Sequence, residues 1–180
     1  MKQVILAISG STRSGSSNNA ILQLIATRFK DEVEIVLYQR IDELPHFNPD
    51  LDQAPFPPNV SELRTLVEQA DGILICTPEY VFSLPGSLKN ALEWLVSTTL
   101  LSFKPAAFIV ASGSGEKAFE SLDLVLKTLL QEDIPEDAKL LIQGSRGKVD
   151  ANGQVIAETE LAIVKVVEAL ILKMYKMNNP

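Results

Sequence analysis

The sequence has a single cysteine, Cys76, and a single histidine, His46, among its 180 residues. One thiol excludes an internal disulfide and any cysteine-rich metal site, and it fits a protein of the reducing cytoplasm. One imidazole is too few for a histidine-based zinc site or a catalytic triad. We therefore expect no metal. We also expect Cys76, at the end of an apolar run, to be inert packing and His46 to lie on the surface.

Positive charge and long apolar runs are also scarce. The chain has 16 Lys and Arg against 23 Asp and Glu, a net charge of −7. This balance argues against a groove that grips a nucleic-acid backbone. No apolar run reaches the roughly 18 residues that span a bilayer, and the apolar stretch near the N-terminus is too short for a signal peptide. We expect neither a nucleic-acid nor a membrane partner.

What the chain does contain is a set of five short apolar runs: Val4–Ser9, Val33–Tyr38, Gly72–Thr77, Ala106–Ser112 and Lys139–Gln143. Four of them are almost continuously hydrophobic, which is typical of parallel strands covered on both faces. The run Val33–Tyr38 alternates more and is expected at an edge of the sheet.

Segments with helical periodicity separate these runs. They are residues 18–29, 61–69 and 85–98, a stripe over residues 122–129 and another over residues 161–171. The alternation predicts an α/β fold, a three-layer doubly wound sheet of five parallel strands in the order 2-1-3-4-5. We expect residues 1–180 to form one domain, with a ligand crevice at the carboxyl ends of strands one and three.

The first strand leads directly into a loop rich in serine and glycine, residues 9–19. Gly10 and Gly15 have the spacing of a nucleotide-triphosphate loop, but Ser16 stands where that loop needs lysine. A terminal monophosphate held by Ser11, Arg13, Ser16 and Asn18 fits better. The alternative is a turn that binds nothing.

Two further loops are expected at the same edge of the sheet. In residues 76–94, Pro78 and Pro85 enclose a shaped loop whose Tyr80 and Phe82 offer flat apolar surface to a planar ring. The alternative is that these aromatic rings pack on the core. Residues 111–119 form another turn of small residues. Three such turns at one edge favour a ligand site.

Three other features allow more than one interpretation. Residues 39–58 contain five of the ten prolines, which predicts either a functional lid or a surface loop stiffened by proline. Val149–Val155 predicts a tight turn around Asn152-Gly153. Trp94 points away from the leucine stripe of its helix, which predicts a subunit contact, with a local pocket in the same domain as the alternative.

The two longest motifs resemble the NADPH-dependent FMN reductase family, a flavodoxin-like group that includes quinone, chromate and azo-dye reductases. The family pattern GSxRxxSxN matches residues 10–18, and the long pattern PEYxxSxPGxLKNAxxW matches residues 78–94. Two positions depart from it. Val81-Phe82 replaces a common Asn-Gly, which removes a side-chain hydrogen bond to the flavin, and the third loop spaces its glycines differently.

The resemblance implies non-covalently bound FMN. The residues expected to hold its phosphate are Ser11, Arg13, Ser16, Ser17 and Asn18. The residues expected to line the isoalloxazine are Pro78, Glu79, Tyr80 and Val81 on one side, and Ser112 and Gly113 on the other.

The resemblance further implies an NAD(P)H oxidoreductase that passes a hydride from NADPH or NADH through bound FMN to a quinone or similar small acceptor. One open flavin face serves both substrates in turn, which predicts ping-pong kinetics, and no catalytic side chain is needed. A homodimer or homotetramer is implied as well. Two alternatives stay open: a flavodoxin-like electron carrier that does not oxidise NAD(P)H, and a binding domain for another small monophosphate.

Overall fold

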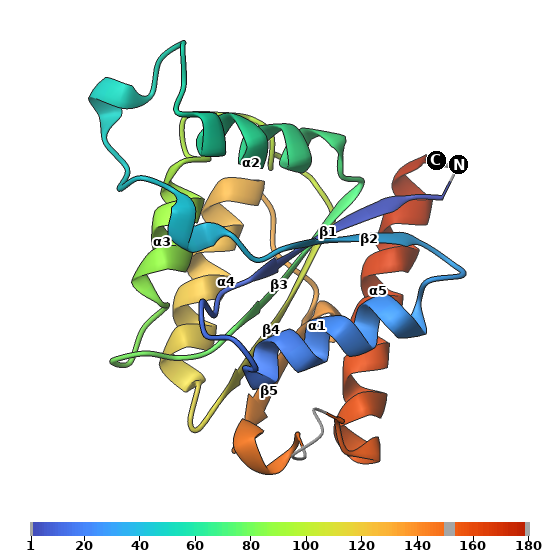
Figure 1. The fold of residues 1–180 in the computed structure, drawn as a ribbon. Coiled ribbons are helices and arrows are strands. Elements are labelled where there is room, and N and C mark those ends of the chain that lie inside the picture. The colour runs from blue at the N-terminus through green and yellow to red at the C-terminus, as the bar shows by residue number, and fades with distance from the viewer. Residues whose placement is uncertain (1, 150–153, 179–180) are drawn as a thin grey trace.

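The computed structural model describes residues 2–149 and 154–178, which contain one parallel sheet with helices on both faces (Figure 1). Its strands are β1 (Val4–Ser9), β2 (Glu34–Tyr38), β3 (Gly72–Thr77), β4 (Ala106–Ser112) and β5 (Lys139–Gln143). They pair in the order β2-β1-β3-β4-β5, and every pair is parallel. This confirms the predicted flavodoxin-like topology.

The burial of the strands follows from their places in the sheet. All residues of β3 and nearly all of β1 and β4 are buried, whereas β2 is at an edge and buries only Tyr38 fully. The strand β2 begins one residue later than predicted. Val33 instead donates its backbone N–H to Phe29 at 3.1 Å, so it closes the turn that follows the first helix.

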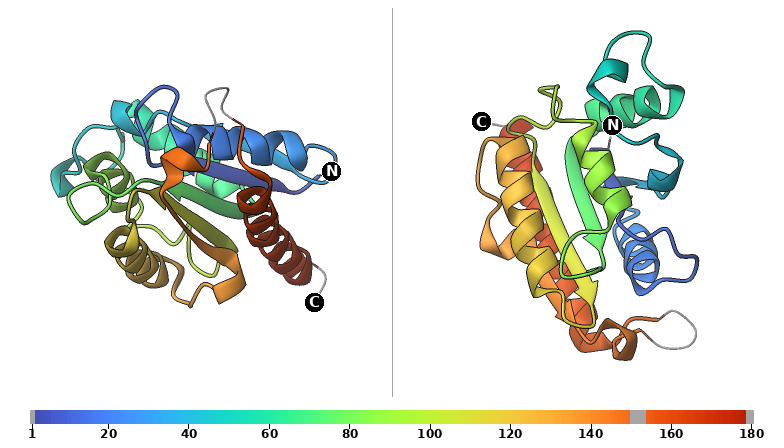
Figure 2. Two further views of the ribbon diagram at one scale, coloured as in Figure 1. Left: turned by 90° about the horizontal axis from the view of Figure 1, so that it is seen from below. Right: turned by 90° about the vertical axis from the view of Figure 1, so that its left-hand side faces the viewer.

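Five helices connect and cover the strands: α1 (Ser17–Arg28), α2 (Pro58–Gln69), α3 (Gly86–Glu93), α4 (Glu116–Leu130) and α5 (Ala157–Asn178). The chain crosses from β1 to β2 in one direction and then moves the other way along the sheet. Right-handed crossovers therefore place α1 on one face and α2, α3 and α4 on the other, and α5 returns to the face of α1 (Figure 2). Within the described residues, no helix is long and apolar enough to cross a membrane.

The helix α3 is shorter than its periodicity predicts: it ends at Glu93, whereas the pattern continues to Thr98. The guanidinium of Arg64 donates to the backbone carbonyl of Trp94 through two nitrogens, at 3.1 and 2.7 Å. In a longer helix, the carbonyl of Trp94 would accept a hydrogen bond from the N–H of Thr98. That N–H donates to the carbonyl of Leu95 instead. A long-range contact thus ends the helix.

Trp94 is fully buried, so the predicted subunit contact through this ring is wrong. Its indole N–H donates to the carbonyl of Pro45 at 2.8 Å, and its ring meets Phe47 edge-on, with 5.1 Å between the centroids. The alternative interpretation, a pocket within the domain, is the one that the structure shows. The proline-rich segment folds over α3 and encloses the ring.

The proline-rich segment is a surface loop, and none of its residues lines the cavity at the carboxyl ends of the strands. Asn90 on α3 accepts from the N–H of Phe47 at 2.7 Å and donates to Pro45 at 3.0 Å. On α2, Arg64 pairs with Asp52 at 2.6 Å. These contacts fasten the loop to α2 and α3, and His46 within it is exposed, as predicted.

The turn predicted around Asn152 and Gly153 lies outside the described residues. Val149 and Val155, which flank it, form an isolated antiparallel bridge. This bridge brings together the two ends of the segment that precedes α5.

Candidate functional site

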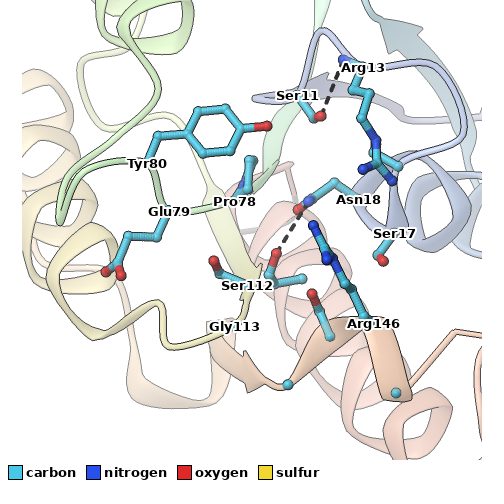
Figure 3. Close-up of a pocket in the computed structure, with 15 residues that line it drawn as sticks. Ser11, Arg13, Ser17, Asn18, Pro78, Glu79, Tyr80, Ser112, Gly113 and Arg146 are labelled. Atoms are coloured by element: carbon cyan, nitrogen blue, oxygen red, sulfur yellow. Dashed lines mark hydrogen bonds between the residues drawn. The ribbon is translucent and has the colours of Figure 1, made fainter.

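A cavity of about 560 Å³ opens at the carboxyl ends of the strands (Figure 3). The loops that follow β1, β3, β4 and β5 form its walls. Ten of the eleven predicted site residues line it: Ser11, Arg13, Ser16, Ser17, Asn18, Pro78, Glu79, Tyr80, Ser112 and Gly113. Its place agrees with the rule that doubly wound sheets bind ligands where the strand order reverses.

The loop after β1 is held close to β3 by Gly10. Its N–H donates to the carbonyl of Cys76 at 2.8 Å, and a Cβ at this position would lie 2.1 Å from Oγ1 of Thr77. No residue but glycine fits this approach without a shift of its neighbour. The loop then enters α1, where the hydroxyl of Ser16 accepts from the N–H of Asn19 at 3.1 Å as the N-cap. The first turn of α1 therefore faces the cavity, and such a turn favours an anion.

Asn18 lies under the floor of the cavity and joins two strands. Its side-chain amide donates to the carbonyl of Ala111 at 3.3 Å and accepts from the thiol of Cys76 at 3.2 Å. Burial raises the pKa of Cys76, so the thiol stays protonated at neutral pH. Cys76 is therefore inert packing, as predicted.

Two arginines reach the cavity from different loops. Figure 3 shows Arg13 and Arg146 with their guanidinium groups directed toward the part of the cavity that holds Ser17 and Asn18. Neither forms an ion pair with any residue that the structure describes. Arg13 makes one long hydrogen bond, from its guanidinium to the carbonyl of Gly15 at 3.5 Å. In a chain of net charge −7, two arginines in one cavity that pair with no described carboxylate favour a multiply charged anion.

Sequence reasoning missed Arg146 and its loop. Gly144 adopts a φ of 62° and donates its N–H to the carbonyl of Gly113 at 3.0 Å, which ties the loop after β5 to the loop after β4. The available signal was positional: small residues around an arginine directly follow a strand whose carboxyl end lies at the same edge.

The loop after β3 contributes a flat wall to the cavity, and the first turn of α4 holds this loop in place. Pro78 is buried, and the ring of Tyr80 is 50% exposed at the cavity. The carboxylate of Glu79 turns away and accepts from the N–H groups of Lys117 and Ala118 in the first turn of α4, at 2.9 and 3.0 Å. Glu79 thus caps α4, and only its backbone is free to face a ligand.

Val81, the eleventh predicted site residue, does not line the cavity. Its side chain is 94% exposed at the tip of the turn, and that of Phe82 is 78% exposed. The interpretation that the aromatic residues of this loop pack on the core is therefore wrong for Tyr80 and Phe82.

The comparisons with known proteins identify the family of this chain. Residues 4–132 match the family described as NADPH-dependent FMN reductase. The chain belongs to this family. The match includes the first three of the four loops that line the cavity, and it ends before the loop of Arg146.

Individual relatives cover most of the chain. A subunit of the NADH:(hydroxy)cinnamate reductase of Vibrio ruber is 34% identical, with 87% of this chain and 79% of the relative covered. The NAD(P)H-dependent FMN reductase of Pseudomonas aeruginosa is 32% identical, with 89% of each covered. Among solved structures, the flavoenzyme NAD(P)H:(acceptor) oxidoreductase of Paracoccus denitrificans superimposes with a TM-score of 0.78 at 26% identity, covering 97% of this chain and 98% of that one.

The residues present fit an FMN molecule. The hydroxyls, the first turn of α1 and two arginines form a donor set for a phosphate at one end of the cavity. Tyr80 and Pro78 supply a flat apolar wall at the other end, and the volume lies in the range of small-molecule sites.

Proposed function

We propose that the protein is an FMN-dependent NAD(P)H oxidoreductase that reduces a quinone or a similar small acceptor. In the overall reaction NAD(P)H gives up one hydride, which together with one solvent proton converts a quinone into its hydroquinone. Bound FMN would supply the hydride acceptance and donation that no amino-acid side chain provides.

In this proposal the chain's own residues would bind the FMN and orient its ring. The residues that would hold the phosphate are Ser11, Arg13, Ser16, Ser17 and Asn18. We include Arg146 as well, because it lines the same cavity. Pro78 and Tyr80 would lie against the ring, the backbone at Glu79 would face its edge, and Ser112 and Gly113 would close the other edge. Val81 contributes only at the rim. No side chain acts as a catalytic acid or base.

One observation carries the proposal: a single cavity joins a cationic, hydroxyl-lined end to a flat apolar wall. A phosphate alone needs no such wall, and an apolar ligand alone needs no cations. Because one open face must serve both substrates in turn, the proposal includes ping-pong kinetics, in which lines of reciprocal rate against reciprocal NADPH at several acceptor concentrations run parallel.

A steady-state assay tests this function. The FMN-loaded protein should consume NADPH rapidly when menadione is present and slowly without it. The acidic charge of the chain favours one other function, an electron carrier that meets basic partners. A normal flavin spectrum with no NADPH consumption would establish the carrier. A protein that FMN does not stabilise against heat would favour a site for another monophosphate.

The proposal also includes the location, the domain organisation and the assembly of the protein. The chain would act in the cytoplasm as a single domain of residues 1–180 and assemble into a dimer or tetramer. An apolar groove between α3 and α4 supports self-association, since Val96 and Leu124 lie there with 58% and 67% of their surface exposed.

A further inference from the structure

The loop after β3 ends in a tight turn with an unusual sequence. The backbones of Tyr80 and Ser83 exchange two hydrogen bonds, at 3.0 and 3.1 Å, and Val81 and Phe82 between them have φ angles of 51° and 54°. Positive φ at both central positions defines a type I′ turn, which strongly prefers Asn-Gly. For a β-branched residue such as Val81 this conformation is strained.

The two side chains gain no burial in exchange for the strain. Val81 is 94% exposed and Phe82 is 78% exposed, so neither belongs to the core. Asn-Gly at these positions would relax the backbone without loss of internal packing. The pair thus lowers stability through backbone strain, and its exposed side chains return almost no hydrophobic stabilisation. Such a pair points to a contact outside the fold.

The turn is held rigidly at the mouth of the cavity. Tyr80, at its start, lines the cavity, and Glu79 before it is fixed to the first turn of α4. On the far side, Leu84 is buried. These anchors hold the tip beside the flat wall, where its exposed side chains would meet a ligand that projects from the cavity.

We propose that Val81 and Phe82 determine acceptor specificity by offering an apolar rim to electron acceptors larger than one ring. This inference rests on the proposed function and names the acceptor class: flat, apolar, fused-ring molecules. A flavin bound among the lining residues would meet Tyr80, whereas Val81 and Phe82 are not among the residues that line the cavity. A nicotinamide dinucleotide carries its charge on phosphates and sugars, which gain little from this rim. A fused-ring quinone that extends past Tyr80 would bury its second ring against Phe82.

The test compares two quinones on two variants. Each quinone takes the hydride from NADPH and one proton from solvent, and the intrinsic reactivity of each is the same for every variant. The ratio of kcat/KM for menadione to kcat/KM for 1,4-benzoquinone therefore isolates the contact with the second ring. In the variant Val81→Asn/Phe82→Gly we expect this ratio to fall about tenfold, the scale of a lost apolar contact.

The same variant should unfold at a temperature about 3 °C higher or more, because the turn is relaxed. The matched control Phe82→Leu keeps an apolar side chain, and we expect it to retain most of the selectivity and the original unfolding temperature. A more stable variant with a lower ratio supports the inference.

Three results would overturn it. An unchanged ratio in the double variant would show that the rim does not contact the acceptor. An unchanged unfolding temperature would show that the turn is not strained. A change of oligomeric mass with an unchanged ratio would assign the tip to a second copy of the chain. In each case benzoquinone reduction by the unaltered protein would still stand, whereas its absence would contradict the proposed function itself.

Discussion

Arg13 is the cation that the loop after β1 brings to the cavity, and its effect on affinity is measurable. Replacing Arg13 by Ala removes a charge-assisted hydrogen bond and should weaken FMN binding by about 1.5–3 kcal/mol. Arg13→Lys is the matched control: it keeps the charge and should lose less. Isothermal titration with FMN measures both. An affinity for FMN that Arg13→Ala leaves unchanged would remove this residue from the phosphate site.

Arg146 reaches the same cavity from the loop after β5, so a second variant asks whether the two arginines share one anion. Arg146→Ala should weaken FMN by about 1 kcal/mol, and more at low ionic strength. If both guanidinium groups hold the same phosphate, the loss in Arg13→Ala/Arg146→Ala differs from the sum of the single losses. Strict additivity would place Arg146 on a different part of the ligand.

At the scale of the elements, Glu79 joins the loop after β3 to the N-terminus of α4. The carboxylate of Glu79 satisfies two N–H groups in the first turn of α4, where the N-cap position is Gly115 and no side chain of the helix itself caps it. Glu79→Ala should lower the free energy of unfolding by about 1 kcal/mol. Glu79→Gln keeps an acceptor oxygen and should lose less. Urea unfolding measures the free energy of unfolding of both variants. Equal losses in Glu79→Ala and Glu79→Gln would contradict the capping role of the carboxylate.

The strands and the helix order were predictable because they depend on local patterns. Continuous apolar runs fix the buried strands, and right-handed crossovers then leave little choice of topology. The end of α3 was not predictable, because Arg64, thirty positions earlier in the chain, takes the carbonyl that the helix would need. The choice between the two interpretations of Trp94 was not predictable for the same reason: its partner is the carbonyl of Pro45, in a loop without periodicity.

The candidate site, too, was predictable only in part. The phosphate residues of the first loop and the flat surface of Tyr80 were predictable from the residues themselves, because glycine, proline and hydroxyl residues at fixed spacing carry a backbone requirement. The roles of Glu79, Ser112 and Gly113 came from the family resemblance. Arg146 was missed because its loop carries no motif and depends on Gly144 binding to the loop after β4. Val81 was placed on the ring by resemblance alone, whereas the turn directs its side chain to solvent.

At the scale of the whole molecule, the exposed groove between α3 and α4 bears on assembly. A dimer through this groove would bury Leu124, so Leu124→Glu should place a charge in the interface and shift the protein toward the monomer. Light scattering after size exclusion measures the mass. Leu161→Glu, at an exposed position on α5, is the matched control and should leave the mass unchanged. A variant Leu124→Glu of unaltered mass would exclude this face as the interface.

The proposed function depends on one ligand, FMN, in one cavity of the molecule. The most direct measurement is the visible absorption spectrum of the freshly purified protein, followed by a calorimetric titration with FMN of any fraction that has lost its ligand. We predict flavin absorption bands that stay with the protein through gel filtration, and saturable heat on titration. A colourless protein that gives no heat with FMN would contradict FMN binding in this cavity.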